Sequence, residues 1–252
     1  MIHSILIIGQ SNMAGRGDME SAEPLDTLGG RLQVLRNGRW QEMFRPVNPD
    51  RPFSGTCLAE SFAKAYAEDH PSVDVGIIPC ADGGTSLDQW REGRLLFDNA
   101  VSCAELAMRT SHLVAILWHQ GESDCPEQLY PLYKEKITAI MKALKEQLHA
   151  EDIPLIVGGL GDYLAKRGEG SFKNYIYVNE ALQSYTESMP HTAFASAKGL
   201  SSKSDLLHFN HESLMEFGIR YYEAFKTIED KARVFDEKSK MDDAVRSEIE
   251  KL

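Results

Sequence analysis

Apolar residues along this chain gather in short runs that are separated by longer stretches of mixed character. The runs are Ile5–Ile8, Val73–Pro79, Leu113–Trp118, Ile153–Gly158 and, more weakly, Thr192–Ser196. A short apolar run without polar alternation is typical of a strand that is buried on both faces, as in a parallel sheet. The pattern therefore predicts five buried strands.

Between these runs, apolar residues recur at intervals of three and four, which is the spacing of an amphipathic helix. The helical stretches are Leu58–Asp69, Leu95–Arg109, Pro126–Leu148, Asn174–Ser188 and Glu212–Lys226. Alternation of strand and helix indicates βαβ units. We expect an α/β fold with three layers, α/β/α, and a doubly wound, mainly parallel, five-stranded sheet of the flavodoxin-like kind.

Two segments depart from the alternation. Residues 18–56 are rich in Gly, Pro, Asp and Arg, and they contain one hairpin pattern, RLQVLRNGRW, with Asn37-Gly38 as its turn. We interpret this segment as an excursion over the ligand-binding face. Residues 229–252 are mostly charged, with a few apolar residues at helical spacing. The prediction is one domain over residues 1–228 and a charged helical tail, packed by one apolar stripe or serving as an oligomer contact.

Composition narrows the classes of partner. The 252 residues carry a formal net charge of −11, which argues against nucleic acid or an anionic membrane as partner. No apolar stretch approaches the ~20 residues of a membrane helix. The N-terminal apolar run is too short for a secretory signal and follows no charged region, so we expect a cytoplasmic protein.

The cysteines do not resemble a metal site. Cys57, Cys80, Cys103 and Cys125 include no closely spaced pair of the kind that binds structural zinc. Their even number would allow two disulfides, but we expect free thiols in a reducing compartment.

Polar, small and titratable residues follow the predicted strands. GQSNMAGRGD follows the first strand, CADGGTS the second and HQGESD the third, while SDLLHFN comes after the fifth across a loop. Ligands in open α/β sheets bind beyond the carboxyl ends of the strands. These four segments are therefore predicted to meet at one binding site.

Ser11 is the candidate nucleophile. It follows the first strand directly, and a hydroxyl at that point can face the crevice at the sheet edge. A serine hydroxyl reacts readily only when a base removes its proton. The alternative is a serine that merely caps a helix.

Asp205 and His208 are the candidate acid and base. Their three-residue separation lets a carboxylate hold one imidazole nitrogen while the other faces a nucleophile. The order Ser, Asp, His agrees with that of α/β hydrolases, although Met13 stands where the GxSxG motif has glycine. His211 is a rival base, ranked lower because it lies at the predicted start of a helix.

An acyl-transfer site also needs donors for an oxyanion. Gly83 and Gly84 supply N–H groups without side chains in the way, and Gln120 supplies a side-chain amide. The alternatives are an ordinary turn for the glycines and a polar residue at a strand end for Gln120.

These segments together resemble the SGNH-hydrolase superfamily, in its sialate O-acetylesterase and carbohydrate esterase family six branch, which includes acetylxylan esterases. That branch is recognised by GQSN, GGTS, HQGE and a late DxxH. The motifs occur here in this order as Gly9–Asn12, Gly83–Ser86, His119–Glu122 and Asp205–His208.

The resemblance implies a single three-layer domain that works without a metal or cofactor. By this resemblance Ser11 matches the nucleophile, Asp205 the acid and His208 the base. The N–H groups of Ser11 and Gly83 and the amide of Gln120 match the oxyanion hole, with Gln120 where many SGNH enzymes have asparagine.

Several residues near the motifs have open roles. Glu122 competes with Asp205 for the role of acid. Trp90 is either a stacking wall for a sugar or a core residue. Gln10 and Asn12 are expected to tie the nucleophile loop together rather than to touch substrate.

Three more residues belong to the neighbourhood of the motifs. Ser123 is a rival nucleophile that the adjacent acidic residues disfavour. Arg16 and Arg51 are candidates for binding an anionic substrate, although surface roles are favoured for both.

The expected function is a serine esterase that removes acetyl groups from O-acetylated carbohydrates through an acyl-enzyme on Ser11. Its expected partner is a small acetylated sugar; the pattern does not specify an oligomeric state. One alternative is a nucleotide- or phosphate-binding protein, suggested by ILIIGQSNMAGRG, although neither GxxxxGK[ST] nor GxGxxG is present. Another is a non-catalytic carbohydrate-binding relative.

Overall fold

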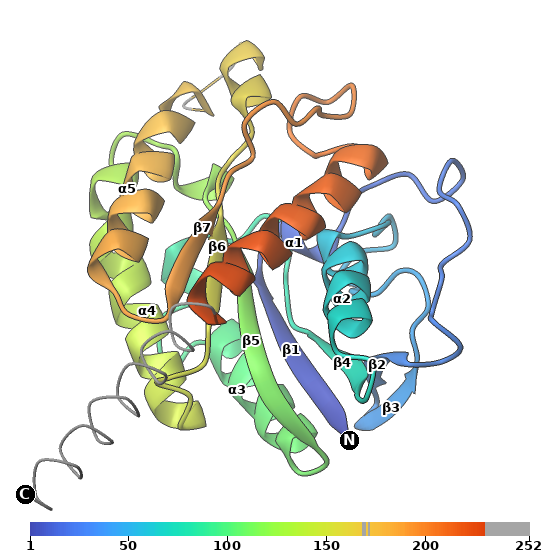
Figure 1. The fold of residues 1–252 in the computed structure, drawn as a ribbon. Coiled ribbons are helices and arrows are strands. Elements are labelled where there is room, and N and C mark those ends of the chain that lie inside the picture. The colour runs from blue at the N-terminus through green and yellow to red at the C-terminus, as the bar shows by residue number, and fades with distance from the viewer. Residues whose placement is uncertain (168–169, 171, 230–252) are drawn as a thin grey trace, which may run out of the picture.

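The computed structural model describes residues 1–167, 170 and 172–229, which form a seven-stranded sheet with helices on both faces (Figure 1). The strands are β1 (Ile2–Gly9), β2 (Leu32–Arg36), β3 (Arg39–Glu42), β4 (Asp74–Pro79), β5 (Ser111–His119), β6 (Leu155–Gly158) and β7 (Thr192–Ala195). The helices are α1 (Ser11–Ala14), α2 (Leu58–Asp69), α3 (Leu95–Met108), α4 (Tyr133–Leu148) and α5 (Tyr175–Ser188), with a further helix over residues 211–229. The predicted tail lies, beyond its first residue, outside the described residues.

The strand order is β3-β2-β4-β1-β5-β6-β7, and every neighbouring pair is parallel except β2 with β3. The predicted strands are β4, β1, β5, β6 and β7, so the doubly wound, mainly parallel sheet is confirmed. The chain changes direction across the sheet at β1, between β4 and β5. A switch point of this kind is where open α/β sheets bind ligands.

The predicted strand count is corrected from five to seven by the hairpin of residues 32–42. Asn37 and Gly38 have φ values of 50° and 72°, which suit a tight hairpin turn. Strand β2 pairs with β4, so the hairpin extends the sheet instead of crossing its binding face. Only other parts of residues 18–56 reach that face.

The helices follow the predicted stretches with one clear difference. Helix α4 begins at Tyr133 rather than at Pro126, and residues 130–132 form a 3-10 turn. Pro131 explains the late start, because proline inside a helix removes a backbone donor and clashes with the preceding turn. In Figure 1, α2 and the helix of residues 211–229 cover one face of the sheet, and α3 and α4 cover the other.

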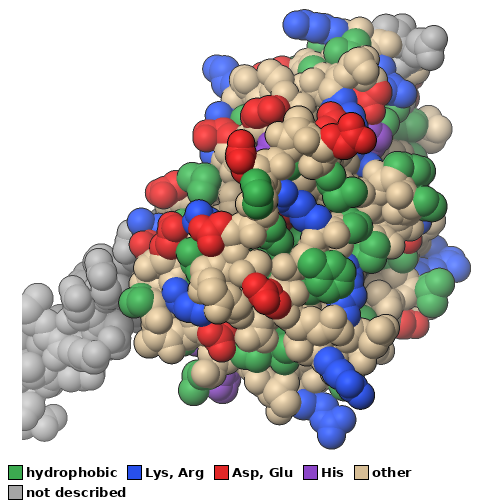
Figure 2. Space-filling view, turned by 90° about the vertical axis from the view of Figure 1, so that its right-hand side faces the viewer, with side chains coloured by type: hydrophobic (Ala, Val, Ile, Leu, Met, Phe, Trp, Pro, Cys, Tyr) green, Lys and Arg blue, Asp and Glu red, His purple; other side chains and the backbone are tan. Residues whose placement is uncertain are grey.

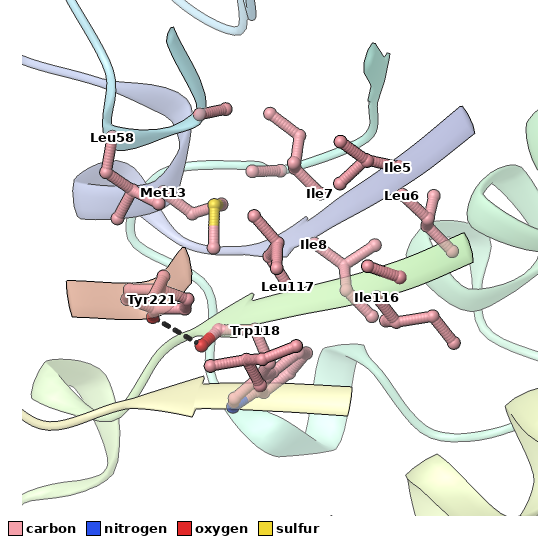
Figure 3. Close-up of a cluster of buried hydrophobic side chains, with 14 of the residues drawn as sticks. Ile5, Leu6, Ile7, Ile8, Met13, Leu58, Ile116, Leu117, Trp118 and Tyr221 are labelled. Carbon is pink, nitrogen blue, oxygen red and sulfur yellow. Dashed lines mark hydrogen bonds between the residues drawn. The ribbon is translucent and has the colours of Figure 1, made fainter. Parts of the chain in front are cut away.

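Strand β1 lies at the centre of the core. The side chains of Ile5–Ile8 are at most 1% exposed and pack with those of Ile116–Trp118, Met13 and Leu58 (Figure 3). The Tyr221 hydroxyl donates to the Trp118 carbonyl at 2.8 Å, which fastens the last helix to β5. Burying each large aliphatic side chain contributes about 1.5–3 kcal/mol. The residue that follows β1 therefore stands on the most firmly packed strand.

Three further observations concern the surface charge, the helices and the cysteines. On the face shown in Figure 2, the described Lys and Arg side chains are scattered among Asp and Glu rather than gathered into a stripe. Within the described residues, no helix combines the length and apolarity needed to cross a bilayer. Cys57, Cys80, Cys103 and Cys125 are free thiols.

Candidate active site

The end of β1 turns sharply into α1 at Gly9. This residue has φ of 129°, and a Cβ at this position would lie 2.1 Å from the carbonyl oxygen of His119. The Gln10 N–H donates to the same carbonyl at 2.8 Å. Glycine is required here because the two backbones approach so closely. The turn brings Ser11, which is 6% exposed, to the first position of α1.

Ser11, His208 and Asp205 lie in one hydrogen-bonded row. The Oγ atom of Ser11 is 3.0 Å from Nε2 of His208. Nδ1 of His208 is 2.6 Å from Oδ2 of Asp205. The structure thus brings together a hydroxyl and an imidazole that are 197 residues apart in the chain. The spatial convergence on which the predicted site depends is present.

The Asp205 carboxylate is organised by its own turn. Its Oδ1 accepts the N–H groups of Leu207 and His208 at 2.9 and 3.0 Å. Partial burial raises the pKa of Asp205, but these backbone donors and the His208 ring lower it more, so the net pKa lies below its ordinary value. Leu206, with φ of 52°, takes the left-handed conformation that closes the turn. Asp205 is therefore held as an anion against His208.

A cavity of about 320 Å³ opens in front of this row. Its lining joins the segments after β1, β4 and β5 with residues 51 and 53, Phe172 and the turn of residues 203–208, called here the late turn. The lining residues are Gln10, Ser11, Arg16, Arg51, Phe53, Gly83, Gly84, Glu122, Ser123, Phe172, Leu207 and His208. Two phenylalanines, Phe53 and Phe172, lie in the lining, and Phe53 is 69% exposed. The cavity combines apolar walls with a few polar groups, as small-molecule sites do.

Gln120 does not reach this cavity, which contradicts its predicted role. It is fully buried, and its Nε2 donates to the Thr85 carbonyl at 3.0 Å and to Oδ2 of Asp124 at 2.6 Å. Both amide hydrogens are thereby engaged inside the protein. Gly83 lines the cavity, but its N–H already donates to Oδ2 of Asp50 at 2.8 Å. Neither group has a hydrogen free for an oxyanion in this arrangement.

Gln10 presents a free amide in their place. Its Oε1 accepts the N–H groups of Gly121 and Ser123 at 3.3 and 3.4 Å. These two backbone donors require the oxygen on that side, so Nε2 points the other way. Gln10 lines the cavity and is 3% exposed, and its Nε2 has no partner among the described residues. Gly84, exposed and with φ of 78°, likewise has an N–H without an acceptor in the described part of the chain.

Glu122 does not contact His208, so it does not compete with Asp205 for the role of acid. Its Oε1 accepts from Asn12 at 2.5 Å and lies 3.5 Å from Nε2 of His119. Burial raises the pKa of Glu122, but His119, a backbone N–H and Asn12 lower it more, so its net pKa lies below the ordinary value. Asn12 is fully buried beside it and points away from the cavity lining.

Trp90 is a core residue rather than a sugar-binding wall. It is 1% exposed and packs edge-on against Trp118, with ring centroids 5.5 Å apart. Ser123 reaches the cavity, but the His208 ring contacts Ser11 and not Ser123 among the described residues. The prediction that favoured Ser11 over Ser123 agrees with this arrangement.

Arg16 and Asp50 belong to the site, although the sequence favoured a surface role for Arg16 and did not single out Asp50. Their side chains are 5% and 3% exposed and are joined by two hydrogen bonds of 2.9 and 2.7 Å. Burial raises the pKa of Asp50, but Arg16, Ser54 and the Gly83 N–H lower it more, so its net pKa lies below the ordinary value. Arg51 is paired with Asp82 at 2.8 Å at the rim of the cavity. No local sequence motif indicates the Arg16–Asp50 pair, because the two residues lie in loops and are 34 positions apart in the chain.

The cavity is not built as a metal centre. In the part of the chain that the structure describes, no three His, Cys, Asp or Glu side chains form a cluster that could hold a metal ion. The expectation that the protein uses no metal or cofactor stays a prediction.

A doubly wound sheet with a hydroxyl, an imidazole and a carboxylate in a row at its carboxyl edge is the arrangement of serine ester hydrolases with an α/β fold, a class that includes the SGNH type. Comparison with known proteins agrees with this class. The family model described as "Carbohydrate esterase, sialic acid-specific acetylesterase" matches residues 2–227. The chain therefore belongs to this family of carbohydrate esterases and is a carboxylic ester hydrolase.

Individual relatives support the same assignment. A probable carbohydrate esterase of Arabidopsis thaliana is 26% identical over 246 residues, which cover 87% of this chain and 88% of that protein. Its crystal structure has a TM-score of 0.78 and is matched over 89% of this chain and 98% of its own. NanS (16% identity, TM-score 0.70, 91% and 98% covered) shares the fold. A carbohydrate acetylesterase of Xanthomonas citri also shares the fold, with 18% identity and a TM-score of 0.67 over 90% of this chain and 56% of its own.

Proposed function

We propose that this protein removes acetyl groups from O-acetylated carbohydrates through an acyl-enzyme on Ser11. The observation that carries the proposal is the 3.0 Å approach of the His208 Nε2 to the Ser11 Oγ, with Asp205 on the other ring nitrogen. A serine hydroxyl needs such a base to become a nucleophile, and the base needs such an acceptor to hold its tautomer. The acetylesterase family of the chain supplies the type of bond that is broken.

The proposed reaction proceeds in two halves. His208 takes the proton of Ser11 as its Oγ attacks the acetyl carbonyl carbon, and Asp205 stabilises the imidazolium that forms. His208 then gives this proton to the sugar oxygen as the bond between that oxygen and the acetyl carbon breaks, which releases the sugar alcohol and leaves the acetyl group on Ser11. A water molecule, deprotonated by His208, attacks the acetyl carbonyl carbon. The bond from that carbon to Oγ breaks, His208 returns the proton to Oγ, and acetate and free serine are released.

The oxyanion is proposed to rest on donors that face the cavity. Ser11 is the first residue of α1, so its N–H has no acceptor within the helix. Gly84 N–H and Gln10 Nε2 are two further donors in the lining that have no acceptor among the described residues. We assign this set in place of Gly83 and Gln120, because the hydrogens of those two groups are already engaged.

The proposed substrate is a small acetylated sugar. The cavity volume of about 320 Å³ lies at the small end of the range for small-molecule sites, and Phe53 and Phe172 offer apolar rings beside the nucleophile. The cationic side chains at this point, Arg16 and Arg51, are each paired with a carboxylate. A negatively charged sugar would therefore meet no unpaired arginine in the described lining, and we propose that neutral acetylated sugars are substrates as well as acidic ones.

The alternatives are less well supported. A phosphate would approach Glu122 and the Asp50 carboxylate that occupies the Gly83 N–H, and both would repel it. A non-catalytic relative would have no need for the close row of Ser11, His208 and Asp205. Nucleotide binding would appear as a thermal shift on addition of ATP, which the esterase proposal does not predict.

The experiment compares the wild type with Ser11→Ala on p-nitrophenyl acetate and on a panel of O-acetylated neutral sugars and sialic acids. We expect turnover by the wild type, its loss in Ser11→Ala, and labelling of Ser11 by a fluorophosphonate. Peptide mass mapping locates the label. Full turnover by Ser11→Ala, or labelling of Ser123 instead, would overturn the mechanism.

A further inference from the structure

Asn12 follows Ser11 directly and contacts the chain on both sides of His208. Its Nδ2 donates to the Leu207 carbonyl at 3.1 Å, and its Oδ1 accepts the Phe209 N–H at 3.1 Å. These groups belong to the two peptide units that flank the His208 Cα atom. One side chain therefore holds both backbone connections of the residue whose ring meets Ser11.

The orientation of the Asn12 amide is fixed by Glu122. The second hydrogen of Nδ2 donates to Oε1 of Glu122 at 2.5 Å. An anionic acceptor on that side and a backbone N–H on the other leave only one placement of the amide nitrogen and oxygen. Asn12 is fully buried, which shields its side-chain amide from solvent. With all three groups engaged, the side chain cannot rotate without leaving buried polar atoms unpaired, which costs free energy.

We propose that Asn12 is a positioning residue that sets the distance between His208 and Ser11. The inference rests on the proposed function of these two residues. Some other bonds of the late turn lie within it: Asp205 accepts the His208 N–H, and the Lys203 N–H donates to the His208 carbonyl. Arg167, from the segment after β6, donates to the Asp205 carbonyl at 2.6 Å. Those bonds shape the turn but do not locate it relative to α1. Asn12 links the turn to the helix that carries the nucleophile.

Two nearby contacts show what Asn12 does that others do not. The Tyr163 hydroxyl also donates to the Leu207 carbonyl, at 3.2 Å, but it comes from the loop after β6 rather than from α1. Lys203 Nζ donates to the Arg16 carbonyl at 3.0 Å, but from a partly exposed side chain near the start of the turn. Among the residues that the structure describes, only the Asn12 bonds connect the neighbour of Ser11 with both neighbours of His208.

The test compares Asn12→Ala with Asn179→Ala, which removes a clamp of the same chemistry elsewhere. Asn179 holds Leu160 through Nδ2 to the carbonyl at 3.0 Å and through Oδ1 from the N–H at 2.7 Å. Misplacing a reacting group by about 1 Å can cost ~100-fold in rate. We expect kcat of Asn12→Ala on p-nitrophenyl acetate to fall by about 100-fold with KM little changed, and fluorophosphonate labelling of Ser11 to slow equally. Asn179→Ala should lower the unfolding midpoint but retain kcat.

The outcomes separate this inference from the proposed function. If the wild type does not hydrolyse p-nitrophenyl acetate, the proposed function fails. If the wild type is active and Asn12→Ala retains kcat, or if Asn179→Ala loses as much, the positioning role fails alone. All assays are run below the unfolding midpoint of each variant. Asn12→Ser, which keeps a polar side chain too short to span both peptide units, is measured beside Asn12→Ala and should show the same loss of kcat.

Discussion

The substitution Gln10→Glu tests the proposed oxyanion donors most directly. Glutamate has the size and shape of glutamine, and one of its oxygens can keep accepting the N–H groups of Gly121 and Ser123, now 3.3 and 3.4 Å from Gln10 Oε1. The other oxygen replaces the Nε2 donor that faces the cavity. The variant therefore exchanges a donor for a negative charge at the proposed place of the oxyanion, with little change in packing.

The expected loss follows from the worth of one such donor. Removing one oxyanion-hole donor costs about 100- to 1,000-fold in kcat, or about 2.7–4 kcal/mol in activation free energy. Since a carboxylate also repels the developing negative charge, we expect kcat of Gln10→Glu to fall by at least about 100-fold, with a smaller change in KM. The assay is steady-state hydrolysis of p-nitrophenyl acetate. The fraction of folded protein is measured by circular dichroism, and kcat is given per folded molecule.

Gln120→Leu is the control, because Gln120 also follows the end of a strand directly but its amide donates only to groups inside the protein. Its loss leaves the buried Thr85 carbonyl without its donor and removes one of two donors to Asp124 Oδ2, which keeps the Leu87 N–H at 2.9 Å. A buried group left unpaired costs about 1–3 kcal/mol, so the unfolding midpoint in urea should fall while kcat per folded molecule stays near that of the wild type. The reasoning is refuted if Gln10→Glu keeps its kcat, or if folded Gln120→Leu loses as much.

Four further predictions use other contacts of the site. Asp205→Asn should lower kcat by about 10,000-fold on p-nitrophenyl acetate, because the imidazole loses the acceptor that holds its tautomer. The lowered pKa of Asp205 stabilises the folded state above the ordinary carboxyl pKa of about 3.9, and this stabilisation is lost as the pH falls through the folded-state pKa. The unfolding free energy of the wild type should therefore fall on the acid side by an amount that Asp205→Asn does not show. Equal pH dependence in the two proteins would contradict this. Phe53→Ala should raise KM for an acetylated sugar several-fold but not for p-nitrophenyl acetate, whereas Phe44→Ala, which removes an exposed ring also stacked by an arginine but outside the cavity, should change neither; equal effects would refute a sugar-binding role. Asp50→Ala should cost about 3–5 kcal/mol in urea unfolding because it strands a buried arginine, while Asp82→Ala, from a partly exposed pair, should cost less than about 1 kcal/mol.

Much of the fold follows from local patterns in the sequence. The five apolar runs became the parallel strands because continuous burial on both faces leaves a clear mark on composition. The hairpin of residues 32–42 was recognisable from its Asn-Gly turn, but its partner strand was not. Pairing of β2 with β4 depends on contacts between segments about 40 residues apart, which no local pattern records.

For the candidate site, too, some features could be predicted from the sequence and others could not. The convergence of Ser11, Asp205 and His208 was predictable, because their residue types and motifs point to one site. That Gln10 lines the cavity while Gln120 does not was not predictable, since both are glutamines next to the end of a strand. It is decided by the direction of each side chain, which the backbone donors of Gly121 and Ser123 fix for Gln10. The sequence alone contains no sign of that direction.

The long separation of Ser11 and His208 has a consequence for the timing of activity during synthesis. The last strand ends at Ala195, so a nascent chain can complete every described strand before the turn that contains His208 has emerged. Until then Ser11 lacks the imidazole that the proposed mechanism requires, so under this mechanism the incomplete chain hydrolyses no esters. Hydrolysis is then expected to begin only when the segment that contains His208 packs beside Ser11.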